Sequence, residues 1–233
     1  MKKIILSLFT AALLVLPSTA TTKWTAADRV APVGKVIVEK NSLPAKLQFK
    51  LVDETVDNSK TSTTNIVQIS KADLTYAGND NEVAAVVAYE LGQIINGKTG
   101  KDNIRAAAKA MLAEKLSKDN IVNTTANSEF WNSKTALRDK KEADMTAVDL
   151  MVKAGYNPVA LITIYNKTLA QTRYEWCHFY PLATKRMVNI YEHIYKKYPQ
   201  YLTNNVYENN IYYKNFLSTT GKEMKKIEKK LNK

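Results

Sequence analysis

The segment that most constrains the fold of this chain is the apolar stretch that follows Asn79. Residues 83–88 are all apolar, and the pattern is continued by Leu91, Ile94 and Ile95. An almost wholly apolar helix lies in a protein core. Asn79 and Glu82 fit a capping box at its start, and Gly97 is a typical helix stop. The sequence therefore predicts a buried central helix.

Glu90 is an acidic residue in the middle of this apolar helix. Burying a carboxylate costs several kcal/mol unless it is paired or bound to a metal. Two readings stay open for Glu90. It lies on a solvent edge of the helix or pairs with a nearby lysine, or it belongs to a functional site.

Two short strands are expected on the N-terminal side of this helix. Residues 47–52 alternate apolar and polar side chains, and residues 65–69 are mostly apolar and β-branched. Residues 21–46 read as a loose N-terminal segment with a short strand at Lys35–Glu39. Residues 103–117 are alanine-rich and predict a further helix.

Helices dominate the second half of the chain. A long helix is expected from Glu129 to Ala154, because Gly155 is a typical stop and Pro158 suits the first turn of the next helix. Another helix is expected over residues 182–197. Residues 205–233 form a basic, tyrosine- and lysine-rich tail, predicted to be partly helical and poorly packed.

The N-terminus has the layout of a secretory signal peptide. Lys2 and Lys3 precede an uncharged run over residues 4–16, and Ser18 and Ala20 supply small residues for cleavage. We expect residues 1–20 to be removed and the protein to be periplasmic or secreted; an uncleaved anchor is the alternative. Cys177 is the only cysteine, so no disulfide forms within the chain.

The chain is strongly basic, with a net charge of +12. Such a charge favours anionic partners, including an anionic envelope surface. The alternative is that the charge reflects an ordinary lysine-rich composition, because no fixed basic motif stands out. Nucleic acid is not an expected partner.

Three segments carry a family resemblance. They are residues 81–95 (NEVAAVVAYELGQII), residues 140–144 (KKEAD) with the helix that ends in AGYNP at 154–158, and residues 180–186 (YPLATKR). In order and spacing they resemble the active-site helix, the E-x-E-A-D motif and the H-P-x-x-x-x-R motif of the HtpX and BepA-like zinc metallopeptidases. These belong to peptidase family 48 and are kin of the CAAX prenyl proteases.

The resemblance covers about residues 45–200 and implies a fold. It implies a peptidase-like domain over residues 47–204 with a mostly helical, zincin-like α+β fold. A small β-sheet would lie next to the active-site helix. In this family two histidines and a glutamate bind zinc, and a glutamate between the histidines activates the bound water.

This sequence keeps some of the family's functional positions and replaces others. The replaced zinc-ligand positions are Tyr89, Gln93 and Lys140. The retained positions are Glu90, the general base, and Asp144, which supports the metal site in the family. Tyr180 stands at the helper-histidine position, and Arg186 matches the arginine of the third motif.

The replacements argue against zinc. Protein-bound zinc takes Cys, His and carboxylate ligands. A lysine facing the ion would add roughly 4 kcal/mol of repulsion per unit charge at ~4 Å. No cofactor is therefore expected. We hypothesise that the Lys140 ammonium takes the place of zinc and pairs with Glu90 and Asp144, while the Tyr89 ring fills the remaining volume.

Three functions are compatible with these residues. The first is a catalytically inactive peptidase-like module of the bacterial envelope that binds an extended peptide or an envelope protein, in quality control or assembly. Its candidate peptide-binding edge is the strand Asn65, Ile66, Val67, Gln68 and Ile69. The second is an active metalloendopeptidase with an atypical metal site, drawing on Glu142, Asp144 and His178. The third is a basic protein that binds the envelope surface through its tail.

Overall fold

A computed structural model describes residues 23–53, 65–96, 132–171, 176–203 and 205–231, without the side chains of residues 132–139, 171 and 176–182. The elements in chain order are α1 (Ala26–Lys40), β1 (Gln48–Val52), β2 (Ile66–Ser70), α2 (Lys71–Leu74), α3 (Asp80–Asn96), α5 (Asn132–Lys153), α6 (Val159–Gln171), α7 (Trp176–Lys197), a 3₁₀ turn η4 (Pro199–Tyr201) and α8 (Ile211–Leu231). The described chain is thus a mostly helical α+β protein. The predicted signal peptide and the helix at 103–117 lie outside the described residues.

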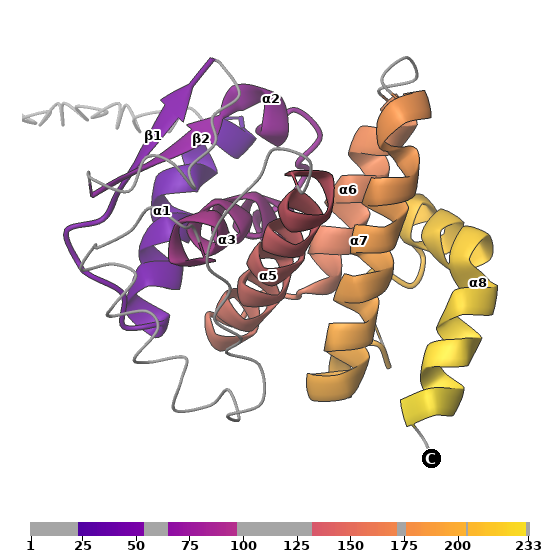
Figure 1. Ribbon diagram of the computed structural model, residues 1–233. Coiled ribbons are helices and arrows are strands. Elements are labelled where there is room, and N and C mark those ends of the chain that lie inside the picture. Colours follow the sequence, from indigo (N-terminus) through magenta and orange to yellow (C-terminus); the bar gives the residue numbers. More distant parts are fainter. Residues whose placement is uncertain (1–22, 54–64, 97–131, 172–175, 204, 232–233) are drawn as a thin grey trace, which may run out of the picture.

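The elements form a row of packed layers. Figure 1 shows α1 and the two strands at one end, α3 and α5 in the middle, and α6, α7 and α8 at the other end. In the described part of the chain, no helix combines the length and the apolar content that crossing a membrane requires.

The N-terminal segment forms helix α1, so the prediction of a loose segment with a strand at Lys35–Glu39 is wrong. The Thr25 hydroxyl caps the helix by accepting a hydrogen bond from the N–H of Asp28 at 3.2 Å. The buried face of α1 packs against α3 and consists of Val30, Val33, Gly34, Ile37 and Val38. The β-branched run at 36–38 favours a strand, but burial of this helical stripe outweighs the local preference.

Strands β1 and β2 confirm the two strands predicted from alternation. They pair in parallel, with Gln48 opposite Ile66 at one end and Val52 opposite Ser70 at the other. Val67 is fully buried, and β2 lies against α3. The sheet therefore lies beside the central helix, as the family resemblance implies.

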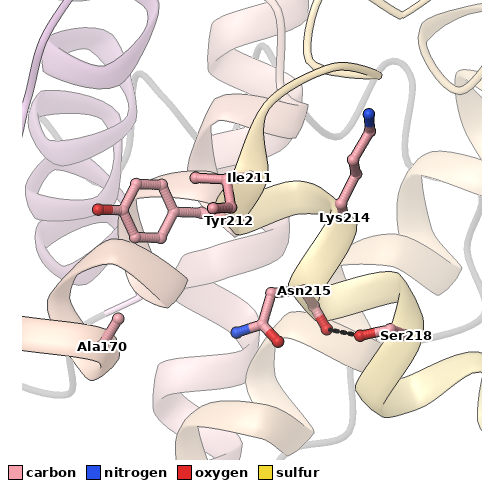
Figure 2. Close-up of a pocket in the computed structure, with 6 residues that line it drawn as sticks. All are labelled: Ala170, Ile211, Tyr212, Lys214, Asn215 and Ser218. Carbon is pink, nitrogen blue, oxygen red and sulfur yellow. Dashed lines mark hydrogen bonds between the residues drawn. The ribbon is translucent and has the colours of Figure 1, made fainter.

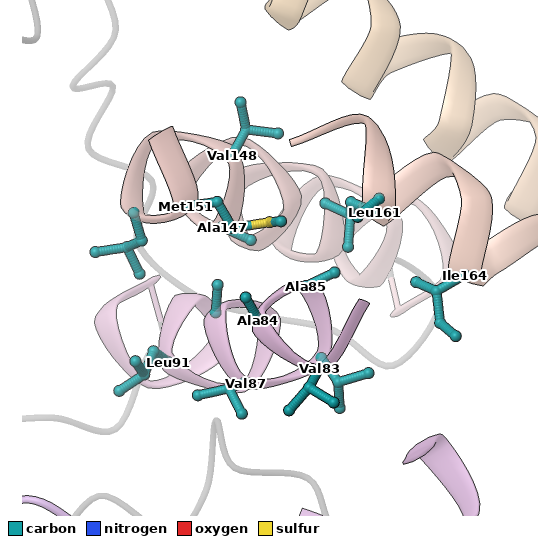
Figure 3. Close-up of a cluster of buried hydrophobic side chains, with 14 of the residues drawn as sticks. Val83, Ala84, Ala85, Val87, Leu91, Ala147, Val148, Met151, Leu161 and Ile164 are labelled. Atoms are coloured by element: carbon teal, nitrogen blue, oxygen red, sulfur yellow. The ribbon is translucent and has the colours of Figure 1, made fainter. Parts of the chain in front are cut away.

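Helix α3 is the buried central helix that its apolar run predicts. Asn79 caps it, because its side-chain oxygen accepts a hydrogen bond from the N–H of Glu82 at 3.0 Å. The apolar side chains of α3 pack with those of α5 and α6 (Figure 3), and they include Val83, Ala84, Ala85, Val87 and Leu91. Burying one valine or leucine completely contributes roughly 1.5–3 kcal/mol, so α3 is a major source of stability.

Helices α3 and α5 approach each other closely at Gly92. A Cβ atom at this position would lie 2.4 Å from the carbonyl oxygen of Ala143, closer than any side chain can come. A glycine is needed here because its missing side chain lets the two backbones meet. This approach brings the second half of α3 next to Asp144 on α5.

The boundary between α5 and α6 confirms the predicted stop and start. Gly155 has a φ of +84°, and the N–H of Tyr156 reaches back to the carbonyl of Met151 at 2.9 Å. These are features of the glycine-ended helix stop called a Schellman motif. Asn157 then caps α6 by accepting a hydrogen bond from the N–H of Val159 at 3.0 Å.

The C-terminal segment is packed, which corrects the prediction of a poorly packed tail. Helix α8 lies against α6 and α7. Its buried residues follow helical spacing and are Tyr213, Phe216, Thr220 and Met224. The tyrosine- and lysine-rich composition conceals this apolar stripe. Helix α7 also begins earlier than expected, at Trp176 rather than Leu182.

Candidate functional site

The three motifs of the family resemblance lie on three neighbouring helices. The first is on α3, the second on α5 and the third on α7, and α5 packs against both of the others. Segments separated by up to a hundred residues therefore meet around the middle of α5. Asp144 is the buried carboxylate at the centre of this site.

Asp144 is fully buried and paired with Arg186 of α7. The Arg186 Nε donates to Asp144 Oδ2 at 2.8 Å, and a terminal nitrogen donates to Oδ1 at 2.7 Å. The Tyr165 hydroxyl of α6 donates to the same Oδ1 at 2.8 Å. The side chain of Asp144 is 0 % exposed and that of Arg186 is 15 % exposed. A two-point arginine–carboxylate pair of this kind is strong and fixes the orientation of both groups.

Two tyrosine rings enclose the Arg186 guanidinium. Its central carbon lies 4.7 Å from the centroid of the Tyr89 ring and 4.5 Å from that of the Tyr165 ring. The two rings meet edge to face, with centroids 6.1 Å apart and planes at 88°. A cation over an aromatic face is attracted by the ring quadrupole, and more so when water is excluded. The arginine is therefore held by an ion pair and by two rings.

Tyr89 is neutral at physiological pH in this environment. Burial is the main cause that raises the pKa of Tyr89 to about 12, and the charges of Asp144 and Glu90 add to the rise, while Arg186 opposes it. Burial also raises the pKa of Tyr165 well above its ordinary value. Both phenols keep their protons, so neither is available as a phenolate ligand.

Glu90 is buried, with 5 % of its surface exposed. Its Oε2 accepts a hydrogen bond at 2.6 Å from the side-chain amide of Gln93, one turn further along α3. The solvent-edge reading of Glu90 is therefore wrong. The residues that the resemblance assigns to the general base and to one zinc-ligand position are thus bonded to each other.

The partner predicted for Asp144 is corrected by the structure. Lys140 is exposed, whereas the hypothesis required it to be buried between Glu90 and Asp144. The cation that binds both oxygens of Asp144 is Arg186. Lys140 lies one turn before Asp144 on α5, and its predicted pairing with Glu90 stays a prediction.

The residues at the zinc-ligand positions do not fit a zinc ion. Zinc needs deprotonated Cys, His or carboxylate ligands. Tyr89 is a neutral phenol stacked on an arginine, the Gln93 amide is bonded to Glu90, and Lys140 is a cation. Across the described residues, no group of three His, Cys, Asp or Glu side chains is arranged to hold a metal ion.

The remaining predicted site residues are dispersed. Tyr180 and His178 lie in helix α7, and their side chains are outside the described residues. His178 therefore does not lie in a loop. Glu142 is exposed on α5, on the side away from buried Ala143 and Asp144.

The candidate edge strand, residues 65–69, forms β2. Hydrogen bonding from the Gln48 N–H to the Asn65 carbonyl, at 2.8 Å, fixes which residues of β2 pair with β1. In a parallel ladder, alternate residues direct their backbone groups to opposite sides. The N–H and carbonyl groups of Ile66 and Gln68 therefore point away from β1.

Tyr165 is the site residue that the sequence analysis missed. It touches Asp144 and Arg186 and forms one wall around the guanidinium. It lies in α6, outside the three motifs, and tyrosine is common in this chain. Nothing local in the sequence distinguishes it from the other tyrosines.

Two further buried charge clusters were also missed. The Glu82 carboxylate is 0 % exposed, and both of its oxygens lie 2.7 Å from the Lys167 ammonium of α6. Asp149 on α5 is bonded to His193 at 2.8 Å and accepts a hydrogen bond from the Tyr198 hydroxyl at 2.9 Å. Burial alone would raise the pKa of Asp149. The hydrogen bonds from His193 and Tyr198 and the charges of His193 and Lys197 together outweigh burial, so the pKa of Asp149 lies below its ordinary value.

The surface hollows lie away from this site. One of about 540 Å³ is open to solvent between α6 and α8, and Figure 2 shows its lining residues Ala170, Ile211, Tyr212, Lys214, Asn215 and Ser218. A second, of about 210 Å³, adjoins it between α6, α7 and α8. Neither is lined by Tyr89, Glu90 or Asp144.

Comparisons of the chain with protein-family models, with curated proteins and with solved structures found no match. The resemblance to the zinc metallopeptidases therefore rests on the three motifs.

Proposed function

We propose that this protein is a catalytically inactive relative of the zinc metallopeptidases, with a zincin-like fold, that binds an extended segment of another protein in the bacterial envelope. The observation that carries this proposal is the environment of Tyr89, whose neutral ring packs on the Arg186 guanidinium at a position that the resemblance assigns to a zinc ligand. At the positions that the resemblance assigns to the zinc ligands stand Tyr89, a neutral phenol stacked on Arg186, and Gln93, an amide bonded to Glu90, where a metal centre would require anionic or imidazole ligands. The contacts among Tyr89, Asp144 and Arg186 support the proposal that the site is stable without a metal ion.

Helix α3 and strand β2 support the binding part of the proposal. An extended peptide adds to a sheet by bonding to backbone groups at a strand edge. The backbone N–H and carbonyl of Ile66 point away from β1, and the buried Val67 side chain anchors the strand to the core beside α3. A rigid edge of this kind reduces the entropy lost on binding.

Metal content and proteolysis test the catalytic part of the proposal. We expect the purified protein to contain far less than one zinc per chain by mass spectrometry of the metal, and to leave casein uncut after zinc is added. The triple variant Tyr89→His, Gln93→His and Lys140→Glu should gain zinc, because it supplies three ligands of the right chemistry. One tightly bound zinc in the wild type, with cleavage that a chelator stops, would contradict the proposal.

A proline substitution tests the binding part. Peptides selected from a random library on the immobilised protein would be measured against wild type and Ile66→Pro. Proline removes an N–H that points away from β1, so the fold should persist while affinity falls by about tenfold. The matched control is Gln48→Ala, which alters an exposed side chain of β1. Selection of no peptide, or equal affinity of Ile66→Pro and wild type, counts against strand addition.

A further inference from the structure

Helix α8 has two opposite faces of different character. Its buried face consists of Tyr213, Phe216, Thr220 and Met224 and packs against α6 and α7. Its exposed lysines are Lys214, Lys222, Lys225, Lys226, Lys229 and Lys230. At 100° per residue all six lie within one half of the helix, centred opposite the buried stripe. The apolar half is already occupied by the protein, so the basic half remains for an external partner.

The charge on this face is not neutralised within the described chain. Glu223 is the one exposed acidic residue of α8 in the described part, since Glu228 is half-buried and accepts a hydrogen bond from the Tyr191 hydroxyl. None of the six lysines forms a salt bridge with another described residue; Lys214 is bonded to the side chain of Asn209. A row of like charges held by a rigid helix creates a strong local positive potential.

Apolar side chains are exposed where α8 begins. Ile211, in its first turn, is 73 % exposed, and Val206, in the preceding turn, is 76 % exposed. Ile211 lies on the same side of the helix as the lysines, and Figure 2 shows it in the same turn as Lys214. Aliphatic side chains beside a line of lysines match the boundary between phospholipid headgroups and acyl chains.

We propose that the exposed face of α8 binds an anionic phospholipid surface, with the lysines on the headgroups and Ile211 and Val206 at the acyl boundary. From Lys214 to Lys230 the helix extends about 24 Å, which suits a flat surface. Single-stranded nucleic acid would require exposed aromatic side chains for base stacking, and α8 exposes none. The proposal is independent of the peptide-binding function.

Vesicle flotation of the full chain tests this proposal. The probes are phosphatidylcholine vesicles with and without about 30 % phosphatidylglycerol, in about 50 mM and about 500 mM sodium chloride. We expect binding to the anionic vesicles alone, with a loss of at least about tenfold in affinity at the higher salt because surface charge is screened.

A charge-matched pair of variants locates the surface. The test variant carries Lys222→Gln, Lys225→Gln, Lys226→Gln and Lys229→Gln, and the control carries Lys40→Gln, Lys46→Gln, Lys50→Gln and Lys153→Gln, all at exposed lysines. Each lysine near an anionic membrane contributes about 1 kcal/mol, so the test variant should lose about 100-fold or more in affinity. The control has the same net charge and should stay within about threefold of wild type.

Three outcomes would overturn the proposal. The first is equal loss in both variants, which indicates a general effect of net charge. The second is binding to neutral vesicles as strong as to anionic ones. The third is binding to a single-stranded oligonucleotide, measured by fluorescence anisotropy at the same salt, that is tighter than vesicle binding and is lost in the α8 variant.

Thermal unfolding of both variants establishes that they are folded, and replacing the same four α8 lysines by arginine should preserve binding.

Discussion

Replacing Arg186 with leucine is expected to destabilise the protein by about 3–5 kcal/mol, because it leaves the buried Asp144 carboxylate without its cation. Asp144 is 0 % exposed and receives two hydrogen bonds from Arg186, so water cannot take over that role without opening the core. The variant also loses the contact with the rings of Tyr89 and Tyr165. Urea denaturation followed by circular dichroism measures the free energy of unfolding.

Two companion variants separate the ion pair from general effects of substitution in α7. Lys185→Ala, at the exposed neighbouring position, should change stability by less than about 0.5 kcal/mol. Tyr165→Phe removes one hydrogen bond to Asp144 and should cost about 1 kcal/mol. A loss below about 1 kcal/mol for Arg186→Leu would show that Asp144 does not depend on its cation.

Replacing Lys167 with methionine is expected to have an effect of similar size. Methionine keeps most of the side-chain volume but leaves Glu82, which is 0 % exposed, without the ammonium 2.7 Å from both of its oxygens. The N–H of Gly78, which donates to Glu82 at 2.7 Å, remains and satisfies part of the carboxylate. We expect a loss of about 3–5 kcal/mol in the free energy of unfolding.

A double variant distinguishes a buried unpaired charge from lost packing at Lys167. In Glu82→Leu with Lys167→Met, both charges are gone, so the loss should be smaller than in Lys167→Met alone. If the double variant is instead the less stable of the two, the unpaired carboxylate is not the cause. Lys153→Met, at an exposed lysine, serves as the control for removing a charge and should be close to neutral.

The sequence predicts part of the candidate site. It singles out Glu90 as an acidic residue in an apolar helix that needs an explanation, and it groups Asp144 and Arg186 in motifs that resemble those of one family. It does not reveal that Arg186 binds Asp144, because the pair spans 42 residues and depends on how α7 packs against α5. Lys140 is the cation near Asp144 in sequence, but local spacing cannot tell that the residue is exposed while the distant Arg186 binds both oxygens of Asp144.

The fold was predictable where a local pattern and burial agree. Strands β1 and β2, helix α3 and the glycine stop at Gly155 follow directly from alternation, apolar runs and turn chemistry. Helix α1 was misread because Val36, Ile37 and Val38 have high strand propensity, while its helical stripe is buried only by contact with α3. Helix α8 was underestimated because its buried residues are scattered among lysines and other polar residues.

The packing of α8 has a consequence for the order in which the molecule can be completed during synthesis. Tyr213 and Phe216 are made after α6 and α7, yet they cover these two helices, and the Tyr207 hydroxyl is bonded to Asn79, the cap of α3. A nascent chain that ends before residue 205 therefore exposes apolar surface that the finished protein buries. This part of the core is therefore completed only after α8 has left the ribosome. A protease that cuts before α8 would expose the apolar surfaces of α6 and α7 that α8 covers.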